Sequence, residues 1–226
     1  MLNIKKNLST LNKNMVNAAN ECDRDAKSIS LLAVSKKHPI ELIKEAHAHG
    51  QNHFGENFVQ EGVDKIRTIK SDKLCWHFIG HIQSNKTRVI AEHFDWVHTV
   101  DRIKIAERLS KQRPIKATSL NVCVQVNIDN EIAKSGVHMS DLVKLCQAID
   151  ELPNLTLRGL MCIPATRDKY KEQRKPFAEL YQQQRLLNEH NLKLDTLSMG
   201  MTNDFQAAIK EGATIIRVGT ALFGSR

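Results

Sequence analysis

The sequence predicts a (β/α)8 barrel preceded by one additional helix. From residue 30 onward, short apolar segments bounded by turn residues alternate with segments whose apolar residues recur at helical spacing. This alternation gives eight strand–helix units of about 25 residues each, which is the usual size of such units in a closed barrel. An open, doubly wound sheet of six or seven strands is the alternative. In either fold a ligand binds at the carboxyl ends of the strands.

Residues 1–28 are expected to form an N-terminal helix that packs on the barrel. The apolar residues of this segment recur at helical spacing and define one face: Leu2, Ile4, Leu8, Leu11, Met15, Ala18, Ala19 and Cys22. No Pro/Gly/Ser-rich linker and no shift of composition interrupts the chain, so residues 1–226 are expected to form a single domain.

The repeating part is assigned element by element from its period and its turn residues. Strands are predicted at residues 30–34, 53–55, 74–79, 96–99, 120–126, 156–161, 196–198 and 214–218. Helices are predicted at residues 39–49, 57–69, 84–93, 102–112, 140–150, 173–190 and 203–211, with a closing helical segment from Thr220. Pro39 suits a first helical position, and Asn57, Asp101, Ser140 and Asn203 are placed at or near N-caps.

Composition argues against several other classes of protein. The 226 residues are 41% hydrophobic and 26% charged, without an apolar run near the ~18 residues that span a bilayer and without a secretory signal at the N-terminus. We therefore expect a cytoplasmic protein with no membrane partner. The five cysteines are odd in number, widely spaced and free of any C-x-x-C pattern, which argues against a disulfide framework and a structural zinc site.

The net charge of +8 indicates an anionic partner, either a small phosphate or a nucleic acid. The densest basic stretches are residues 111–116 and 167–175. Aromatic residues make up only 5% of the chain, and no motif for reading a nucleic acid appears. Nucleic-acid binding is therefore kept as a distant alternative, and no nucleic-acid partner is expected.

Lys36 is the most informative residue, because it directly follows the predicted strand 30–34 and precedes a turn. An amine at the mouth of a barrel can form a Schiff base with an aldehyde cofactor, although a lone loop lysine is usually just solvated. Two Gly/Ser/Thr-rich turns near the end of the chain, at residues 197–204 and 217–224, have the composition that binds phosphate through backbone N–H groups. An aldehyde-binding amine and a phosphate site together indicate pyridoxal 5′-phosphate (PLP).

Several candidate residues also have an ordinary structural interpretation. Ser198 and Thr202 could cap the helix near Asn203, and Asn57 could be an N-cap. Arg217 could pair with a surface carboxylate. Lys134 is a candidate second amine near the mouth, but it could equally be a solvated loop lysine.

His77 and His81 lie four residues apart, which raises the question of zinc. Gly80 interrupts the segment, and no carboxylate or cysteine is recognised at ligand spacing beside the two histidines. No metal site is predicted.

Seven motifs, in order from Lys36 to Gly224, resemble those of the pyridoxal-phosphate homeostasis protein family. They are Ala33-Val-Ser-Lys36, Phe54-Gly-Glu-Asn-Phe-Val-Gln-Glu61, Trp76-His-Phe-Ile-Gly80 with Gln83-Ser-Asn-Lys86, Lys134-Ser-Gly136, Arg158-Gly-Leu-Met161 with Ile163-Pro-Ala165, Ser198-Met-Gly-Met-Thr202, and Arg217-Val-Gly-Thr220. The family resembles the N-terminal barrel domain of alanine racemase, a fold-type III PLP enzyme, without its second domain. One departure is His81, which stands where the family pattern has a proline or a similar residue.

The resemblance implies a role for each matching residue. Lys36 would hold PLP covalently as an aldimine. The 5′-phosphate would be bound by Ser198, Gly200, Thr202, Gly219 and Thr220, and Asn57 would line the edge of the ring. The guanidinium of Arg217 would face the pyridine nitrogen and leave it unprotonated, because arginine donates hydrogen bonds without losing its proton.

Two functions remain open at this point. In the first, the protein holds and buffers PLP and delivers it to PLP-dependent apoenzymes, with indirect effects on amino-acid and keto-acid balance. In the second, it is a fold-type III amino-acid racemase, which needs a second acid/base opposite Lys36. The racemases take that group, a tyrosine, from their second domain. Here the only tyrosines are Tyr170 and Tyr181, in or before the predicted helix 173–190, so we favour the carrier. The resemblance covers the barrel without the second domain, which is the usual dimerising surface of the racemases, so we expect a monomer.

Overall fold

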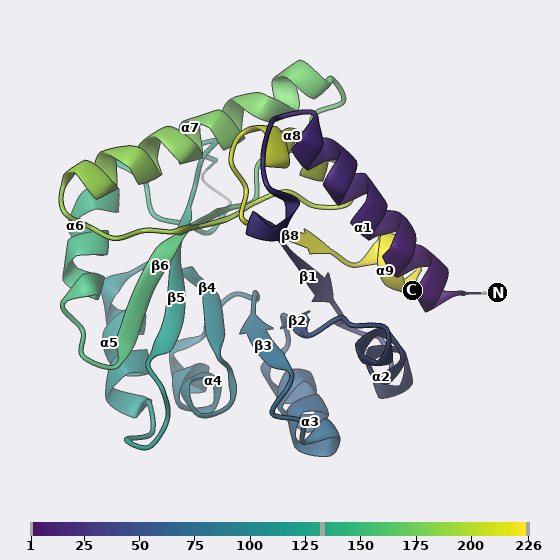
Figure 1. The fold of residues 1–226 in the computed structure, drawn as a ribbon. Coiled ribbons are helices and arrows are strands. Elements are labelled where there is room, and N and C mark those ends of the chain that lie inside the picture. Colours follow the sequence, from purple (N-terminus) through teal and green to yellow (C-terminus); the bar gives the residue numbers. More distant parts are fainter. Residues whose placement is uncertain (1, 132–133, 225–226) are drawn as a thin grey trace.

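Eight parallel strands form a closed barrel in the computed structural model, which describes residues 2–131 and 134–224 (Figure 1). Neighbouring strands in the chain are neighbours in the barrel, and β1 closes the ring by pairing with β8. The strands are β1 (Ser30–Val34), β2 (His53–Glu56), β3 (Cys75–Phe78), β4 (Trp96–Val100), β5 (Leu120–Val126), β6 (Leu155–Cys162), β7 (Thr196–Ser198) and β8 (Ile215–Val218). The predicted barrel is confirmed, and the open sheet is wrong.

Helices surround the ring of strands, as Figure 1 shows. They are α1 (Ile4–Asn20), α2 (Ile40–Ala48), α3 (Val59–Ile69), α4 (Thr87–His93), α5 (Ile103–Gln112), α6 (Met139–Asp150), α7 (Tyr170–Glu189), α8 (Phe205–Lys210) and α9 (Thr220–Phe223), with short 3₁₀ turns η1 (Ala26–Ser28) and η2 (Ser84–Lys86). The largest errors in the predicted bounds are two helix starts, each wrong by three residues: α4 begins at Thr87 instead of residue 84, after the turn η2, and α7 begins at Tyr170 instead of residue 173. The carbonyl of Lys169 accepts hydrogen bonds from the backbone of Glu172 and Gln173, so the helix has already begun when it reaches Pro176.

The four residues predicted at or near N-caps each lie one or two residues from the observed N-cap. The N-cap positions of α3, α5, α6 and α8 are Phe58, Arg102, His138 and Asp204, and none of these side chains makes a capping hydrogen bond. Asn57 therefore lies outside α3, and its side chain is available for another role. Packing of the helices on the barrel determines where they begin, because cap chemistry contributes only about 1 kcal/mol per helix.

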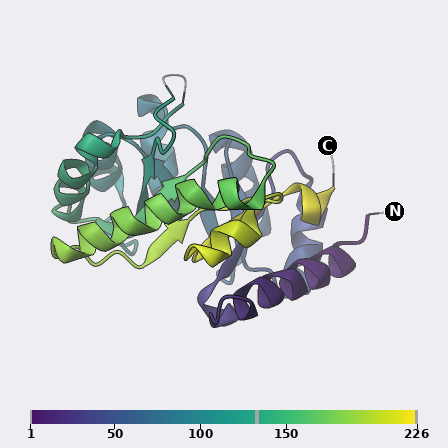
Figure 2. The ribbon, with the colours of Figure 1, turned by 90° about the horizontal axis from the view of Figure 1, so that it is seen from above.

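Helix α1 packs against α2, α8 and α9, so the two ends of the chain lie side by side (Figure 2). Its buried residues are those that the helical period predicted, apart from exposed Leu2 and half-buried Cys22 at the two ends. Two polar contacts fix the helix: the Asn7 side chain donates to the carbonyl of Leu222 (2.9 Å), and Arg24 donates to the carbonyl of Ile209 (2.7 Å). The N-terminal segment thus covers the seam where β8 meets β1.

The core consists of the barrel interior and a layer of apolar side chains between strands and helices. The interior is not wholly apolar, since His77, His98, Ser198 and Arg217 are all buried there. In the part of the chain that the structure describes, no helix is long and apolar enough to cross a membrane.

Candidate cofactor site

A cavity of about 240 Å³ lies at the carboxyl ends of the strands, and we call it the cofactor cavity. Its lining comes from both ends of the chain, because β1 and β8 are neighbours in the barrel. The lining residues are Val34, Lys36, Asn57, Ile79, Met161, Ile163, Met201, Thr202, Arg217, Gly219 and Thr220. The closed barrel thus brings Lys36, Asn57, Thr202, Arg217, Gly219 and Thr220, all predicted from the sequence, to one cavity.

Lys36 is half-buried at the mouth, two residues beyond the end of β1. The backbone on both sides of it is fixed by α3: Lys65 donates to the carbonyl of Ser35 (2.8 Å), and the backbone N–H of Lys37 donates to Glu61 (2.5 Å). Lys37 has a positive φ of 60°, which turns the chain away from the mouth immediately after Lys36. The side chain of Lys36 therefore extends from a backbone that has little freedom to move.

The residue that organises this turn is Lys65, which the sequence analysis missed. Its side-chain nitrogen lies 2.7 Å from carboxylate oxygens of both Glu56 and Glu61, and Glu56 also accepts a 2.6 Å hydrogen bond from the Ser35 hydroxyl. Burial raises the pKa of Glu56, while the charge of Lys65 and hydrogen bonds to Lys65 and Ser35 act against that rise. Lys65 looked like one more solvated lysine, and only its helical spacing from the apolar face of α3 could have marked it as buried.

Arg217 lies on β8 with its guanidinium inside the barrel, 5% exposed. It donates to the carbonyl of Ser198 (2.6 Å), to the Ser198 hydroxyl (2.9 Å) and to the carbonyl of Cys162 (2.8 Å). Burial lowers its pKa, but arginine keeps its proton in proteins. The surface ion pair considered from the sequence is wrong, because Arg217 is buried and these neutral oxygens are its hydrogen-bond acceptors.

A column of three histidines continues from Ser198 through the barrel interior. The ring of His98 lies 2.7 Å from the Ser198 hydroxyl, His77 lies 2.8 Å from His98, and His53 lies 3.0 Å from His77. Burial lowers the pKa of His98 to about 3, helped by the charge of Arg217, and burial also lowers the pKa of His77 well below its ordinary value. These rings are therefore neutral near pH 7. The column connects Arg217, which lines the cofactor cavity, to the opposite mouth of the barrel.

The structure gives Ser198 and Gly200 positions beside the cofactor cavity instead of in its lining. The Ser198 hydroxyl is fully buried between His98 and Arg217. Gly200 has a φ of +91°, and a Cβ there would lie 2.5 Å from the Cβ of Ala208, so only glycine fits. Its carbonyl accepts from the backbone N–H of Arg217 (2.9 Å). Both residues hold Arg217 in place, and their predicted contact with the phosphate stays a prediction.

Thr202, Gly219 and Thr220 stand together at the rim of the cofactor cavity. A Cβ at Gly219 would come within 3.1 Å of the Val34 carbonyl oxygen, so the backbone of the β8–α9 turn approaches β1 closely. Thr202 and Thr220 thus bring two hydroxyl-bearing side chains to the cavity beside Gly219, and their predicted contact with the phosphate stays a prediction.

The Oδ1 atom of Asn57 is buried and has no hydrogen-bond partner among the residues that the structure describes. A buried amide oxygen without a partner costs about 1–3 kcal/mol, which a ligand can recover by donating a hydrogen bond. Gly80 explains how Asn57 is placed: a Cβ there would lie 2.2 Å from the Asn57 carbonyl oxygen, so the segment after β3 can approach this turn only at a glycine.

The remaining candidates lie elsewhere. Lys134 forms a 2.6 Å ion pair with Glu131 and lines a separate cavity of about 300 Å³ that also includes His81. His77 points into the barrel, so the two histidines of the zinc question do not meet. In the basic stretch 167–175, Arg167, Arg174 and Lys175 each pair with a carboxylate, which leaves a weaker basic surface than the sequence suggests.

The fold and the site together define a class of protein. The family of the alanine racemase N-terminal domain matches residues 7–226. The alanine racemase of Corynebacterium glutamicum superposes with a TM-score of 0.74 at 16% identity, covering 99% of this chain and 60% of that chain, which shows the shared fold alone. The chain is therefore a barrel of the alanine racemase N-terminal type.

Relatives of full length narrow the assignment. The pyridoxal phosphate homeostasis protein of Vibrio cholerae is 51% identical over 230 residues, covering 100% of this chain and 98% of that protein. PipY of Synechococcus elongatus, solved with PLP bound, superposes with a TM-score of 0.86 at 38% identity, covering 98% of this chain and 100% of that chain. This chain belongs to the pyridoxal phosphate homeostasis protein family.

Proposed function

We propose that this protein holds PLP in the cofactor cavity and delivers it to PLP-dependent apoenzymes, without catalysing amino-acid chemistry. The observation that carries the proposal is the set of polar side chains in the described lining: the amine of Lys36, the amide of Asn57, the guanidinium of Arg217 and the hydroxyls of Thr202 and Thr220. These groups suit an aldehyde, a pyridine ring and a phosphate. No histidine, tyrosine, cysteine or carboxylate is among the described lining residues.

Lys36 forms the covalent link in this proposal. Its neutral amine would hold the aldehyde carbon of PLP through a carbon–nitrogen double bond, with the aldehyde oxygen released as water. The rigid turn built by Lys65 keeps the amine at the mouth, which reduces the entropy lost on bond formation. Bound PLP supplies an electrophilic carbon and a ring that can accept negative charge.

The other residues orient the cofactor. Thr202, Gly219 and Thr220 bind the 5′-phosphate at the rim, supported by Ser198 and Gly200 behind them, and Asn57 meets the edge of the ring through its unpartnered oxygen. Arg217 donates to the pyridine nitrogen and does not give up a proton, so the ring is a weak electron sink.

A racemase needs a proton donor on the face of the ring opposite Lys36. Tyr170 and Tyr181 lie on α7 with 49% and 38% of their surfaces exposed, and neither lines the cofactor cavity. Among the described lining residues, Lys36 is thus the one whose side chain can accept and donate a proton near pH 7. This supports the carrier over the racemase.

The test uses borohydride reduction, which fixes PLP on the lysine that holds it. We expect the pyridoxyl label on Lys36, its loss in Lys36→Ala, and its retention in the matched control Lys37→Ala, since Lys37 is the adjacent exposed lysine. Label on another lysine in the wild-type protein would overturn the assignment.

A second measurement separates carrier from racemase. The protein with PLP bound is incubated with L-alanine in D₂O and the α-proton is followed by NMR, while a parallel sample is mixed with an apo-aminotransferase. We expect α-proton exchange no faster than with free PLP, together with reactivation of the apoenzyme. Exchange at enzymatic rates that is lost in Lys36→Ala would establish the racemase instead.

We also propose that residues 1–226 act as one PLP-binding unit, monomeric and cytoplasmic. The packing of α1 against α2, α8 and α9 supports a single unit. Sedimentation velocity of the protein with PLP bound, read as the mass of the sedimenting species, tests the monomer.

A further inference from the structure

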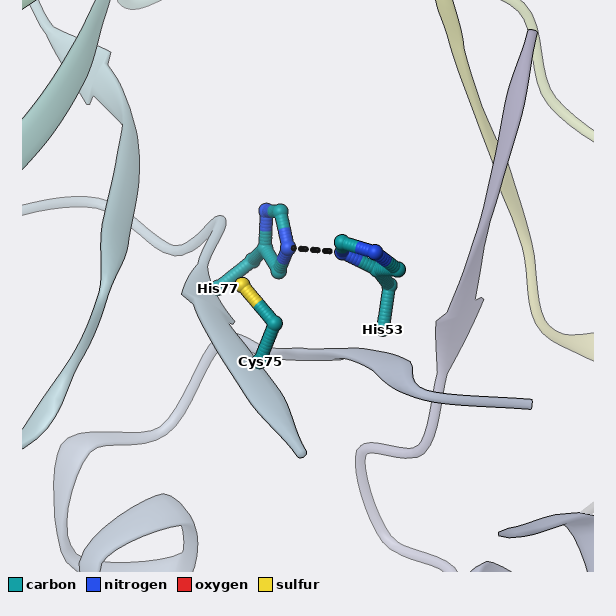
Figure 3. Close-up of side chains that lie close together, drawn as sticks. All are labelled: His53, Cys75 and His77. Atoms are coloured by element: carbon teal, nitrogen blue, oxygen red, sulfur yellow. Dashed lines mark hydrogen bonds between the residues drawn. The ribbon is translucent and has the colours of Figure 1, made fainter. Parts of the chain in front are cut away.

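A second group of chemically active side chains lies at the opposite mouth of the barrel. His53, Cys75 and His77 are close together there, and their potential ligand atoms all lie within 4.8 Å of one another. Figure 3 shows the rings of His53 and His77 facing each other, with the Cys75 thiol rising from the same side of β3 as His77. Neither the PLP site nor the family assignment uses this cluster.

The sheet itself creates the cluster. His53 on β2 is paired directly with Cys75 on β3, and His77 is two residues further along β3. Residues two apart on a strand point to the same face, and paired residues on adjacent strands are close neighbours. Three side chains are thus held together by hydrogen-bonded backbone, which is the kind of support a precise site needs.

The spacing fits a tetrahedral metal ion. Bonds of about 2.0–2.1 Å to nitrogen and 2.3 Å to sulfur put the ligand atoms of zinc about 3.3–3.6 Å apart. The nitrogens of His53 and His77 are already 3.0 Å apart, and because all the potential ligand atoms lie within 4.8 Å of one another, the thiol needs to approach by no more than about 1.2 Å. A cavity of about 320 Å³, distinct from the cofactor cavity, is lined by both histidines but not by Cys75, and it gives an ion access to the two rings and room for water as a fourth ligand.

The surroundings also suit a cation. His77 makes a 2.8 Å hydrogen bond through its other nitrogen to His98, which is the outer contact that orients a metal-binding imidazole. The negative charge of Asp95 acts on both His53 and Cys75. Arg158, the cation that lines the same cavity, is paired with Asp195 at 2.6 Å, so its charge is balanced locally.

We propose that His53, Cys75 and His77 form a binding site for a zinc-type divalent ion at the amino-terminal mouth of the barrel. Two imidazoles and one thiolate are the ligand types that zinc prefers. Coordination forms one sulfur–metal bond and two nitrogen–metal bonds, and it releases one proton, from the Cys75 thiol. The imidazoles remain neutral, with the ring proton of His77 donated to His98.

Calorimetric titration of the full-length protein with zinc chloride tests the site. We expect one zinc ion per chain in the wild type, and an affinity at least about a hundredfold weaker in Cys75→Ala, because losing a ligand costs more than the 10–100-fold of an outer contact. Cys22→Ala is the matched control, since Cys22 is also a half-buried free thiol but lies at the end of α1. It should bind zinc as the wild type does.

If Cys75→Ala does not fold, alkylation of the wild-type protein tests the zinc site instead. Zinc should slow alkylation of Cys75 by N-ethylmaleimide at least about tenfold, read by peptide mass spectrometry, because a metal-bound thiolate is held by its ligand bond. Alkylation of Cys22 should be unchanged. Absence of zinc binding in the wild type, equal affinity in Cys75→Ala, or equal alkylation rates with and without zinc would each overturn the proposal. The PLP measurements above are independent of these outcomes.

Discussion

Replacing Lys65 with methionine would remove the cation that contacts the buried carboxylate of Glu56. The side chains of Lys65 and Glu56 are 6% and 0% exposed, so water screens their 2.7 Å ion pair very little. Methionine keeps most of the volume and length of lysine but donates no hydrogen bond. The substitution therefore leaves a carboxylate without its partner in the wall beside Lys36.

The expected cost follows from this burial. Removing one partner of a buried ion pair destabilises a protein by about 3–5 kcal/mol. With an unfolding entropy of about 2.1 cal/mol/K per residue over 226 residues, Tm falls by about 6–11 °C. The matched control is Lys44→Met on α2, an exposed helical lysine, which should change the free energy of unfolding by less than about 0.5 kcal/mol.

Urea unfolding at two pH values checks the physical reason. Burial already raises the pKa of Glu56 with Lys65 present. A carboxyl whose folded pKa is raised binds its proton more tightly in the folded state, so its contribution to stability falls as pH rises through that pKa. The loss caused by Lys65→Met should therefore be larger at pH 8 than at pH 5.

Adding Glu56→Gln to Lys65→Met should recover part of the lost stability, because the glutamine has no charge to leave unpaired. A cost below about 1 kcal/mol for Lys65→Met, or a further loss in the double variant, would refute the reasoning.

Three further predictions concern single side chains. Asn57→Ala should not lower the free energy of unfolding measured in urea, because Oδ1 has no partner to lose among the described residues, yet it should weaken PLP binding measured by absorbance titration. Gly200→Ala should cost about 1–3 kcal/mol more than Gly50→Ala, since both glycines have a positive φ but only the first Cβ would meet Ala208; equal costs in urea would contradict the steric argument. The folded pKa of His98 is about 3, so below pH 6.5 the unfolded chain binds more protons and stability falls with pH. Between pH 6.5 and 5 this residue should cost about 2 kcal/mol, and the slope should be shallower in His98→Gln, measured by urea unfolding at each pH.

The fold was predictable because the period of apolar residues is a local signal. The strands 30–34, 120–126 and 196–198 were predicted with the bounds that the structure has. Helix starts were less predictable: Asn57 and Ser140 look like caps, but the packing of α3 and α6 on the barrel determines where those helices begin.

Site residues could be predicted from the sequence only where they follow or end a recognisable strand. Lys36 and Arg217 follow or end apolar strands, so sequence alone directs them to the mouth of a barrel. His98 and Lys65 carry no such signal, because their partners lie 100 and 9 residues away and their burial depends on barrel closure and helix orientation. Cys75 stands two residues before His77, yet its nearness to His53 appears only when β2 and β3 pair in register.

The hydrogen bonds of the histidine column are coupled to one another in their direction of donation. Each neutral imidazole has one N–H, so a ring that donates at one nitrogen must accept at the other. The direction of donation at any one bond from Ser198 to His53 therefore fixes all the others, and the column has two states of opposite dipole. A change of partner at His53 reverses a dipole whose far end lies beside the guanidinium of Arg217. A metal ion bound to His53 and His77, as proposed above, would leave the column in the state in which His77 donates to His98.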